Sequence, residues 1–507
     1  MKKKNFYGCI GILALTLSFS ACSSDDGGNG GSGTPSVEWT TNNGIKACNQ
    51  LLFTADGDKN VSLEGKQIGN GDAEFVFTGK QTLKKGTYLM KGWVYIADGA
   101  ELTIEPGTVI KGDKQTKASL IVERGGKLIA QGSAQAPIVF TSNSPAGNRK
   151  PGDWGGVIIC GKAKNNKQEM QIEGGPRTRH GGNDDGDNSG VLSYVRIEFA
   201  GYPFATDQEI NGLTLGSVGS GTKIDHVQVS YSNDDSFEWF GGKVNCKYLI
   251  AYKGWDDDFD TDNGFGGNVQ FGLSIRDPKI ADISQSNGFE SDNNADGSKS
   301  EPHTKAVFSN MTFIGPKALA TDFINDNSYI NGGEYNPGNG SSHGKFQAAI
   351  HIRRDSHLNC FNSVVVGWPI GVILDNQKGD TQGAASNGLL KLQNIWFANL
   401  NIKGSDFNKV YEDHLYDYTA KSTDPTKPSF TSSFLSTQPT NKWFDNTTGW
   451  FDQTGYLPVA GSPLLTAATF TDALLSGFDK VAYIGAFGTA ENWTSGWANF
   501  DPQHAQY

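Results

Sequence analysis

Three related segments lie between residues 224 and 293: Val227-Gln-Val-Ser-Tyr231 before Asp234-Asp-Ser-Phe-Glu238, Tyr248-Leu-Ile-Ala-Tyr252 before Asp256-Asp-Asp-Phe-Asp260, and Phe271-Gly-Leu-Ser-Ile275 before Ser286-Asn-Gly-Phe-Glu290. Each is a short apolar run followed by a polar cluster that ends in Phe and a carboxylate. The units recur after about 20–30 residues, a period typical of solenoids. A repeat of one strand and one polar turn cannot bury a face alone, so the pattern predicts stacked coils.

The composition favours an all-β chain. Gly accounts for 65 of the 507 residues, whereas the helix former Met occurs only 4 times. Runs rich in Val, Ile, Tyr, Phe and Thr are interrupted by Gly, Asn or Asp, which is typical of short strands separated by turns. A chain of this length exceeds one compact core, but the core of a solenoid grows lengthwise. We predict an N-terminal cap over 37–75, a parallel β-helix over 76–400 and a C-terminal cap over 401–507.

Strand-like runs bounded by Gly or Pro begin near residue 93. They are Trp93–Ile96, Leu102–Ile110, Ser119–Val122, Lys127–Ala130 and Pro137–Thr141. This part of the chain resembles the opening coils of right-handed parallel β-helix surface lipoproteins of Bacteroidetes. The resemblance is carried by these runs and by Ala100-Glu-Leu-Thr-Ile-Glu-Pro-Gly-Thr-Val-Ile-Lys-Gly112 and Asp153-Trp-Gly-Gly-Val-Ile-Ile159. The resemblance continues to Asn492-Trp-Thr-Ser-Gly-Trp497. It implies an all-β, right-handed, single-stranded parallel β-helix and a surface location, and it transfers no catalytic residue.

The first 36 residues have the features of an export signal. Lys2–Lys4 form a basic region, Ile10–Phe19 form an apolar run too short to cross a bilayer, and Ser20-Ala21 precede Cys22. The run resembles a bacterial lipobox, which implies removal of residues 1–21 and acylation of Cys22. Ser23-Ser-Asp-Asp26 resembles the signal that sends such lipoproteins to the outer face of the outer membrane. Residues 22–36 then form a flexible tether. We expect a surface-exposed outer-membrane lipoprotein, with retention in the periplasm as the alternative.

Charge and cysteine content narrow the range of partners. The formal net charge is −11, which argues against nucleic acid and against any polyanion held by charge alone. Some members of that family resemble accessory lipoproteins of TonB-dependent uptake systems, so the resemblance implies such a transporter as a partner. Four cysteines follow the signal, at 48, 160, 246 and 360. Their spacing matches no zinc pattern, and we expect buried thiols, with one disulfide left open.

The carboxylates that end the three units are the first candidate site. Successive strands of a parallel solenoid lie about 4.8 Å apart, so Glu238, Asp260 and Glu290 form a column if the three Phe-acid pairs align, and the sequence does not fix that register. Stacked carboxylates repel and raise one another's pKa unless a cation lies between them. Three interpretations follow: a Ca²⁺ site, a surface for sugar hydroxyls, or a ladder of solvated turns, which is the most ordinary outcome. The preceding Phe237, Phe259 and Phe289 are expected to stack inside the coils.

The segment Asp256-Asp-Asp-Phe-Asp-Thr-Asp-Asn263 is the densest acidic run, and carboxylate oxygens are the ligands that Ca²⁺ prefers. It is not an EF-hand, because Val269 stands where the bidentate Glu is needed. The predicted Ca²⁺ ligands are Asp256, Asp257, Asp258, Asp260 and Asp262. The predicted ligand-binding residues are Asp234, Asp235, Glu238, Trp239, Trp255 and Glu290. The two Trp rings would stack on sugars, although packing against an adjoining loop explains them equally well.

A polysaccharide hydrolase or lyase is the main alternative to a binding protein. A glycosidase needs two carboxyl groups about 5.5 Å or about 6.5–9.5 Å apart, and neighbouring coils could supply either. Asp234-Asp235, Asp257-Asp258, Ser342-His343-Gly344 and Arg353-Arg354 loosely resemble the motifs of polygalacturonase-like hydrolases, but His343 is several coils from Asp258 in sequence. His351 alternates with apolar neighbours and is expected to face outward. We therefore predict a surface protein that binds a glycan or small nutrient, with no catalytic residue assigned and a structural or adhesive role third.

Overall fold

The structure is a computed structural model that describes residues 39–42, 45–48, 54–56, 60–62, 67–69, 71, 73–205, 208–489 and 492–507. All of these residues belong to one unit within 37–507. The predicted signal peptide, Cys22 and the tether lie outside the described residues. None of the helices within the described ranges has the length and apolar character needed to cross a bilayer.

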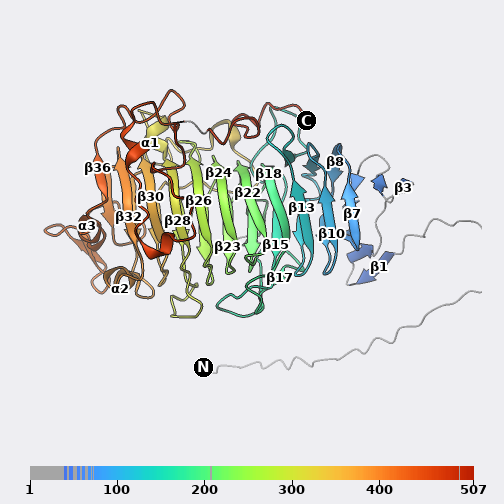
Figure 1. The fold of residues 1–507 in the computed structure, drawn as a ribbon, viewed down its shortest axis with the longest axis horizontal. Helices are drawn as coiled ribbons and strands as arrows, with labels where there is room; N and C mark the ends of the chain where they lie inside the picture. Colours follow the sequence, from blue (N-terminus) through green and yellow to red (C-terminus); the bar gives the residue numbers. More distant parts are fainter. Residues whose placement is uncertain are drawn as a thin grey trace, which may run out of the picture. The chain divides into compact units, whose positions relative to one another are not determined.

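Two long sheets run along the molecule and make it a parallel β-helix, as the sequence predicted (Figure 1). The first sheet has 13 strands. They are β1 (Trp39–Asn42), β2 (Ile45–Cys48), β6 (Ala73–Phe77), β9 (Trp93–Ile96), β12 (Ser119–Val122), β15 (Gly156–Cys160), β21 (Leu213–Gly216), β23 (Phe237–Phe240), β25 (Phe259–Asp262), β27 (Phe289–Ser291), β29 (Ala348–Ile352), β31 (Ile370–Leu374) and β33 (Ile402–Ser405). Beyond the antiparallel β1–β2 pair, its neighbouring strands are parallel.

The second sheet has 17 strands and forms the opposite side of the coils. They are β3 (Thr54–Asp56), β4 (Asn60–Ser62), β5 (Gln67–Ile68), β7 (Lys80–Leu83), β8 (Thr87–Met90), β10 (Glu101–Ile104), β11 (Val109–Gly112), β13 (Lys127–Gln131), β14 (Ile138–Ser142), β18 (Gly190–Glu198), β22 (Lys223–Ser230), β24 (Asn245–Tyr252), β26 (Asn268–Ile275), β28 (Val307–Ile314), β30 (Asn359–Val366), β32 (Leu392–Ala398) and β36 (Lys442–Phe444). β18 pairs with both β13 and β14, so one long strand replaces two short ones from that coil onward.

Each long strand bends at one residue with a positive φ. These residues are Tyr194, His226, Tyr248, Phe271, Asn310, Asn362 and Asn394, with φ between 49° and 64°. The register of the strands places them in one row. Asn tolerates this left-handed conformation, and the aromatic members stack, with ring centroids 4.3 Å apart for Tyr194–His226 and 4.4 Å apart for His226–Tyr248. We call this row the bend ladder.

The interior of the coils is a continuous apolar core. Phe237, Phe259 and Phe289 are fully buried in it, and the centroids of the first two rings are 5.5 Å apart, which confirms their predicted stacking. Cys160, Cys246 and Cys360 are free and buried, so their thiols pack as small apolar side chains. Because every coil buries its apolar residues against the next, the core extends along the axis.

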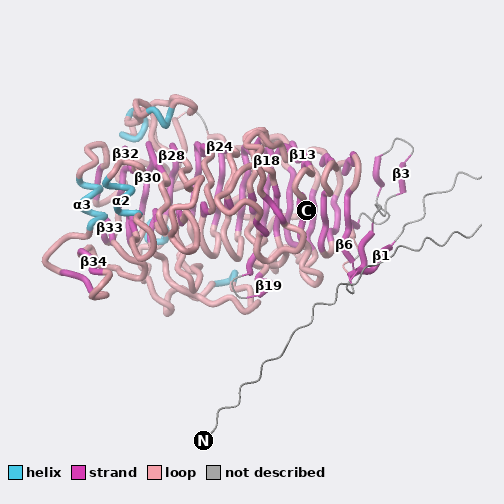
Figure 2. The backbone as a smooth tube through the Cα atoms, turned by 90° about the horizontal axis from the view of Figure 1, so that it is seen from below, coloured by secondary structure: helices cyan, strands magenta, loops and turns pink. Residues whose placement is uncertain are grey.

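The C-terminal residues cover two different parts of the molecule. Near the last coil, α3 (Phe430–Ser436) contacts β33, and β36 pairs with β32, while α2 (Thr381–Ser386) lies at the same end (Figure 2). Residues 463–489 and 492–507 instead run back along the bend ladder toward the first coils (Figure 1). We call them the C-terminal strap. Only part of the predicted cap 401–507 therefore covers the last coil.

Hydrogen bonds and rings hold the strap to the bend ladder. Asn362 donates to Thr469 O at 2.9 Å, and Asn310 donates to Tyr483 O at 2.8 Å. Farther along, the Trp497 ring packs edge-on against Tyr194 at 5.9 Å, and the Tyr507 hydroxyl lies 2.7 Å from Glu198 Oε1. The strap thus covers side chains that the bends turn outward.

The remaining elements are short. They are β16 (Met170–Gln171), β17 (Arg179–His180), β19 (Pro203–Ala205), β20 (Gln208–Glu209), β34 (Leu415–Asp417), β35 (Ser422–Asp424), α1 (Pro316–Leu319), and the 3₁₀ turns η2 (Gly333–Tyr335), η3 (Pro463–Thr466) and η4 (Ala473–Leu475).

Candidate functional site

The predicted column of carboxylates forms on the outer face of the first sheet. Strand pairing places Glu238 opposite Asp260, Asp260 opposite Glu290, and Glu290 opposite His351. The register puts the buried Phe residues side by side, and since side chains alternate between the two faces of a strand, the next residue faces outward. The register therefore meets the condition on which the predicted column depended, and His351, which the sequence did not place there, continues the column.

A second row, formed by Asp235 and Asp257, joins each coil to the next by hydrogen bonds. The Asp257 N–H donates to Asp235 Oδ1 at 2.8 Å, and the Asn287 N–H donates to Asp257 Oδ1. Asn211 and Asn287 hold the same position in the flanking coils, where their side-chain oxygens accept from Asp235 N and Ala348 N at 3.2 and 3.1 Å. Each side chain thus satisfies a backbone donor of the next coil, and we call this row the turn ladder. It is buried, and it differs from the ladder of solvated turns considered from sequence, which concerned Glu238, Asp260 and Glu290.

A third row lines a groove of about 590 Å³. Asp234, Asp256 and Asp282 come from three successive coils, with Glu209 beside them. The opposite wall is the loop 339–342, which is held in place because Asn233 donates to Ser341 Oγ at 2.9 Å. The groove therefore combines carboxylates with amide and hydroxyl groups, a lining suited to sugar hydroxyls or to a hard cation.

The predicted Ca²⁺ ligands do not form one site. Asp258 is fully buried and paired with Arg276, with Oδ1 and Nη1 2.8 Å apart, while Asp257 belongs to the turn ladder. A strand and a tight turn cannot direct these five side chains, which are spread over seven positions, to one point. Carboxylates from neighbouring coils gather instead. The two groups in the described chain whose donor oxygens lie within 4.8 Å of one another are Asp234, Asp235 and Asp256, and Asp235, Glu238 and Asp260.

Two oxygen atoms in these groups have no partner. Asp256 Oδ1 and Asp260 Oδ1 are both buried, and neither makes a hydrogen bond within the described chain. A buried carboxylate oxygen without a partner is unfavourable, because its hydration has been lost and not replaced. Asp262, the fifth predicted ligand, lies one pleat farther along β25, and the Asn263 N–H donates to its Oδ1 at 2.5 Å.

Crowding changes the acidity of these carboxyl groups. Burial, together with repulsion from neighbouring carboxylates, raises the pKa of Asp234, Glu238, Asp256 and Asp260. Burial and the nearby Asp292 raise the pKa of Asp262 to about 7. Full ionisation of these groups at neutral pH, without a proton or a cation between them, would be costly.

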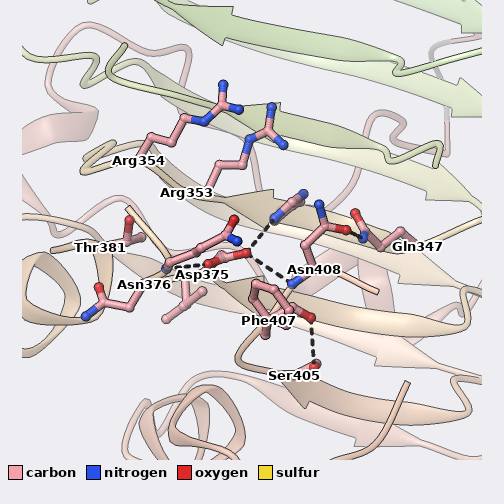
Figure 3. A network of polar contacts seen from close by, with 12 residues as sticks. Gln347, Arg353, Arg354, Asp375, Asn376, Thr381, Ser405, Phe407 and Asn408 are labelled. Atoms are coloured by element: carbon pink, nitrogen blue, oxygen red, sulfur yellow. Dashed lines mark hydrogen bonds and ion pairs between the residues drawn. The ribbon is translucent and has the colours of Figure 1, made fainter. Parts of the chain in front are cut away.

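The downstream end of the column is basic. Arg353 forms ion pairs with Glu290 and with Asp292, and Arg354 lies 2.5 Å from Asp292. Burial opposes ionisation of Glu290, but Arg353 and His351 outweigh it and lower its pKa to about 2. Figure 3 shows both guanidinium groups pointing away from Asp375, whose carboxylate accepts from the Asn408 N–H at 3.0 Å. Charge of both signs therefore meets on this face.

The side chains of Trp239, Trp255 and His351, which were predicted to be accessible, are buried. Trp239 is stacked between Phe237 and Phe265 in the core, with centroids 6.0 and 5.3 Å away. Trp255 is equally buried and contacts His343, 5.1 Å away. His351 is fully buried between Glu290 and Asp375. Trp239 and Trp255 are thus packing residues and cannot stack on a sugar, so that part of the prediction is corrected.

His343 lies closer to the acidic rows than its sequence position indicated. The insertion between β28 and β29 folds back, so His343 forms a β-bridge with Asp282, and Asn336 lies 3.1 Å from its Nε2. Counting coils missed this contact, because the insertion is a loop and not a coil. A run rich in Gly, Asn and Ser at 331–344 is the only sequence signal for a returning loop.

The fold and this face together define a β-helix protein with an acidic surface groove. A family model described as a pectate-lyase-like β-helix domain matches residues 76–443, and the chain belongs to this family. No curated protein and no solved structure gave a significant match.

Proposed function

We propose that the protein binds a polysaccharide in the acidic groove with the help of Ca²⁺ held between neighbouring coils. The observation that carries this proposal is the pair of buried, unpartnered oxygens, Asp256 Oδ1 and Asp260 Oδ1, each next to carboxylates of the preceding coil. A cation there would supply the missing partner and offset the repulsion. Asp234, Asp235 and Asp256 would hold one ion, and Asp235, Glu238 and Asp260 a second.

The groove fits a sugar chain better than a compact nutrient. It is lined by residues of successive coils, so its binding groups recur along the axis as the units of a polysaccharide do. Carboxylates would accept hydrogen bonds from hydroxyl groups, and Ser341 and Asn339 would provide further polar contacts. Ca²⁺ would also bridge to the carboxylates of an acidic polysaccharide, which the charge of the groove would otherwise repel.

Titration calorimetry with Ca²⁺, followed by a panel of neutral and uronate-containing polysaccharides, tests this proposal. We expect Ca²⁺ binding in the wild type and its loss in the double variant Asp256→Asn, Asp260→Asn. The matched control, Asp445→Asn, changes an exposed carboxylate near the last coil and should bind as the wild type does. Glycan binding that is equal in the wild type and the double variant would refute the assigned site.

A second candidate function is cleavage of the bound polysaccharide. The favouring observation is that neighbouring carboxyl groups have opposite shifts: the pKa of Asp260 is raised and that of Glu290 is lowered to about 2. A carboxyl with a raised pKa and a carboxyl with a lowered pKa, on paired strands about 4.8 Å apart, resemble the acid and nucleophile of a retaining glycosidase. Release of reducing ends by the wild type and not by Asp260→Asn would favour a hydrolase. Release of unsaturated uronate would favour a lyase.

The cell-surface location is also part of the proposal. Acyl chains on Cys22 would anchor the protein in the outer membrane, and a TonB-dependent transporter would receive the captured glycan or nutrient. Mass spectrometry of the N-terminal peptide should find an acylated Cys22, and Cys22→Ser should release the protein from membranes. Proteolysis of intact cells would distinguish surface display from periplasmic retention. Failure to co-purify a transporter would favour the adhesive alternative.

A further inference from the structure

A pocket away from the acidic groove contains two histidines and an aspartate. It has a volume of about 550 Å³ and is lined by His303, Asp355 and His357 among others. His303 precedes β28, and the other two lie in the turn between β29 and β30 of the next coil. The His357 N–H donates to Thr304 O at 2.8 Å, which fixes the two coils in register and brings the two rings together.

The environment of His303 is unusual because both ring nitrogens face carboxylates. Nδ1 lies 2.7 Å from Glu301 Oε1, and Nε2 lies 3.0 Å from Asp355 Oδ2. If Nδ1–H donates to Glu301, then the lone pair of Nε2 faces a lone pair of Asp355 Oδ2. A proton or a cation must lie between Nε2 and Asp355 to make that contact favourable.

His357 completes the arrangement. Its ring is parallel to that of His303, with centroids 4.3 Å apart and planes 11° apart, and it makes no ring hydrogen bond to any described residue. Two imidazolium ions stacked this closely would repel.

Asp355 is held so that one oxygen remains available. Its Oδ1 accepts from the Asp380 N–H at 3.2 Å, and its own N–H donates to Thr381 Oγ1 at 3.1 Å. Oδ2 is thereby directed at His303. One donor atom from each of His303, Asp355 and His357 lies within 4.8 Å of the others, and rotation of the half-exposed His357 can bring them closer.

We propose that His303, Asp355 and His357 bind a divalent first-row transition metal ion such as Zn²⁺, with Glu301 orienting His303. Two imidazoles and one carboxylate are ligands that such ions prefer over Ca²⁺, and a carboxylate on the far ring nitrogen is the usual support of a ligating histidine. Three protein ligands leave a coordination position open toward the pocket, where Lys299 and Lys305 favour an anionic ligand. This site is independent of the proposed glycan function.

The test uses the purified protein without a polyhistidine tag, loaded with Zn²⁺ or Co²⁺ and dialysed at neutral pH. Elemental analysis should find one ion per chain, and Co²⁺ should give the visible absorption of a low-coordinate nitrogen and oxygen site. His357→Ala and Asp355→Asn should lose the ion. Glu301→Gln, which changes an exposed side chain, should weaken binding by about 10–100-fold. His414→Ala removes an exposed histidine from another region and serves as the control, which should behave as the wild type.

Circular dichroism establishes that each variant is folded before its metal content is compared, and Glu301→Gln tests the site without changing a buried group. Retention of one Zn²⁺ per chain by both His357→Ala and Asp355→Asn would overturn the assignment. The assignment would also be overturned if the folded wild type retains no Zn²⁺, or if the double variant Asp256→Asn, Asp260→Asn is the one variant that loses Zn²⁺. Excess Ca²⁺ should not displace the ion, because it binds imidazole poorly.

Discussion

Asp258 and Arg276 form an ion pair in the interior, with Oδ1 and Nη1 2.8 Å apart and both side chains fully buried. Asp258 also accepts a hydrogen bond from Ser274, and Arg276 donates to Trp255 O at 3.2 Å. The pair therefore fixes the turn after β24 against β26, and it removes Asp258 from any surface site.

Arg276→Met should destabilise the protein by about 3–5 kcal/mol, because it leaves Asp258 buried and unpaired. Urea denaturation monitored by circular dichroism measures this loss. Lys247→Ala breaks an exposed pair with Asp479 and is the matched control, for which about 1 kcal/mol or less is expected. Equal losses in the two variants would contradict the structural role of the buried pair.

The turn ladder should tolerate amides but not truncation. Asp235→Asn and Asp257→Asn keep the oxygen that accepts from the next coil and remove charge from a crowded face, so their stability in EDTA should equal or exceed that of the wild type in EDTA. Asp257→Ala leaves the Asn287 N–H without a partner and should cost about 1–3 kcal/mol. A stabilised Asp257→Ala would show that repulsion outweighs the hydrogen bond.

Stability without Ca²⁺ should decrease as the pH rises from about 4 to 7. Asp262 has a folded-state pKa raised from 3.8 to about 7, so the folded protein binds more protons than the unfolded chain within this interval. Its stabilising effect is complete below the unfolded pKa and is lost as the pH passes the folded pKa. The raised pKa values of Asp256 and Asp260 act in the same direction.

Melting temperatures in EDTA and in Ca²⁺ across this pH range check that expectation. Ca²⁺ should restore stability mainly near neutral pH, where the carboxylates need a counter-charge. Asp260→Asn should flatten the dependence in EDTA. Glu290 has the opposite effect, because its pKa of about 2 lies below its ordinary value. Its contribution to the stability of the fold is lost as the pH falls from about 4.5 toward 2. A flat profile between pH 4 and 7 would contradict the crowding of this face.

The C-terminal strap should contribute to the stability of the central coils. Trp497→Ala removes a buried ring that packs on Tyr194 and His226 and should cost about 3–5 kcal/mol. Leu474→Ala, in an exposed part of the strap, is the control and should cost far less. Limited proteolysis should cleave the strap of Trp497→Ala first. Unchanged melting of this variant would show that the strap is a passive cover.

The sequence by itself determined the repeating coil, but not the register of one coil on the next. The Phe-acid units predicted the stacking of Phe237, Phe259 and Phe289 and the outward column of Glu238, Asp260 and Glu290, because alternation along a strand is a local property. It also predicted most of the strands from Trp93 onward, because their apolar runs are bounded by Gly and Pro.

Only the tertiary structure decided which carboxylates share a site. Asp256, Asp257 and Asp258 are consecutive in sequence, yet one lines the groove, one caps the next coil and one pairs with Arg276 in the interior. Their roles depend on residues in other coils, and the lengths of the intervening loops set which residues meet. The same is true of His303 and His357, which lie 54 positions apart and stack only because two coils are in register. Contacts across coils are not encoded by any local pattern.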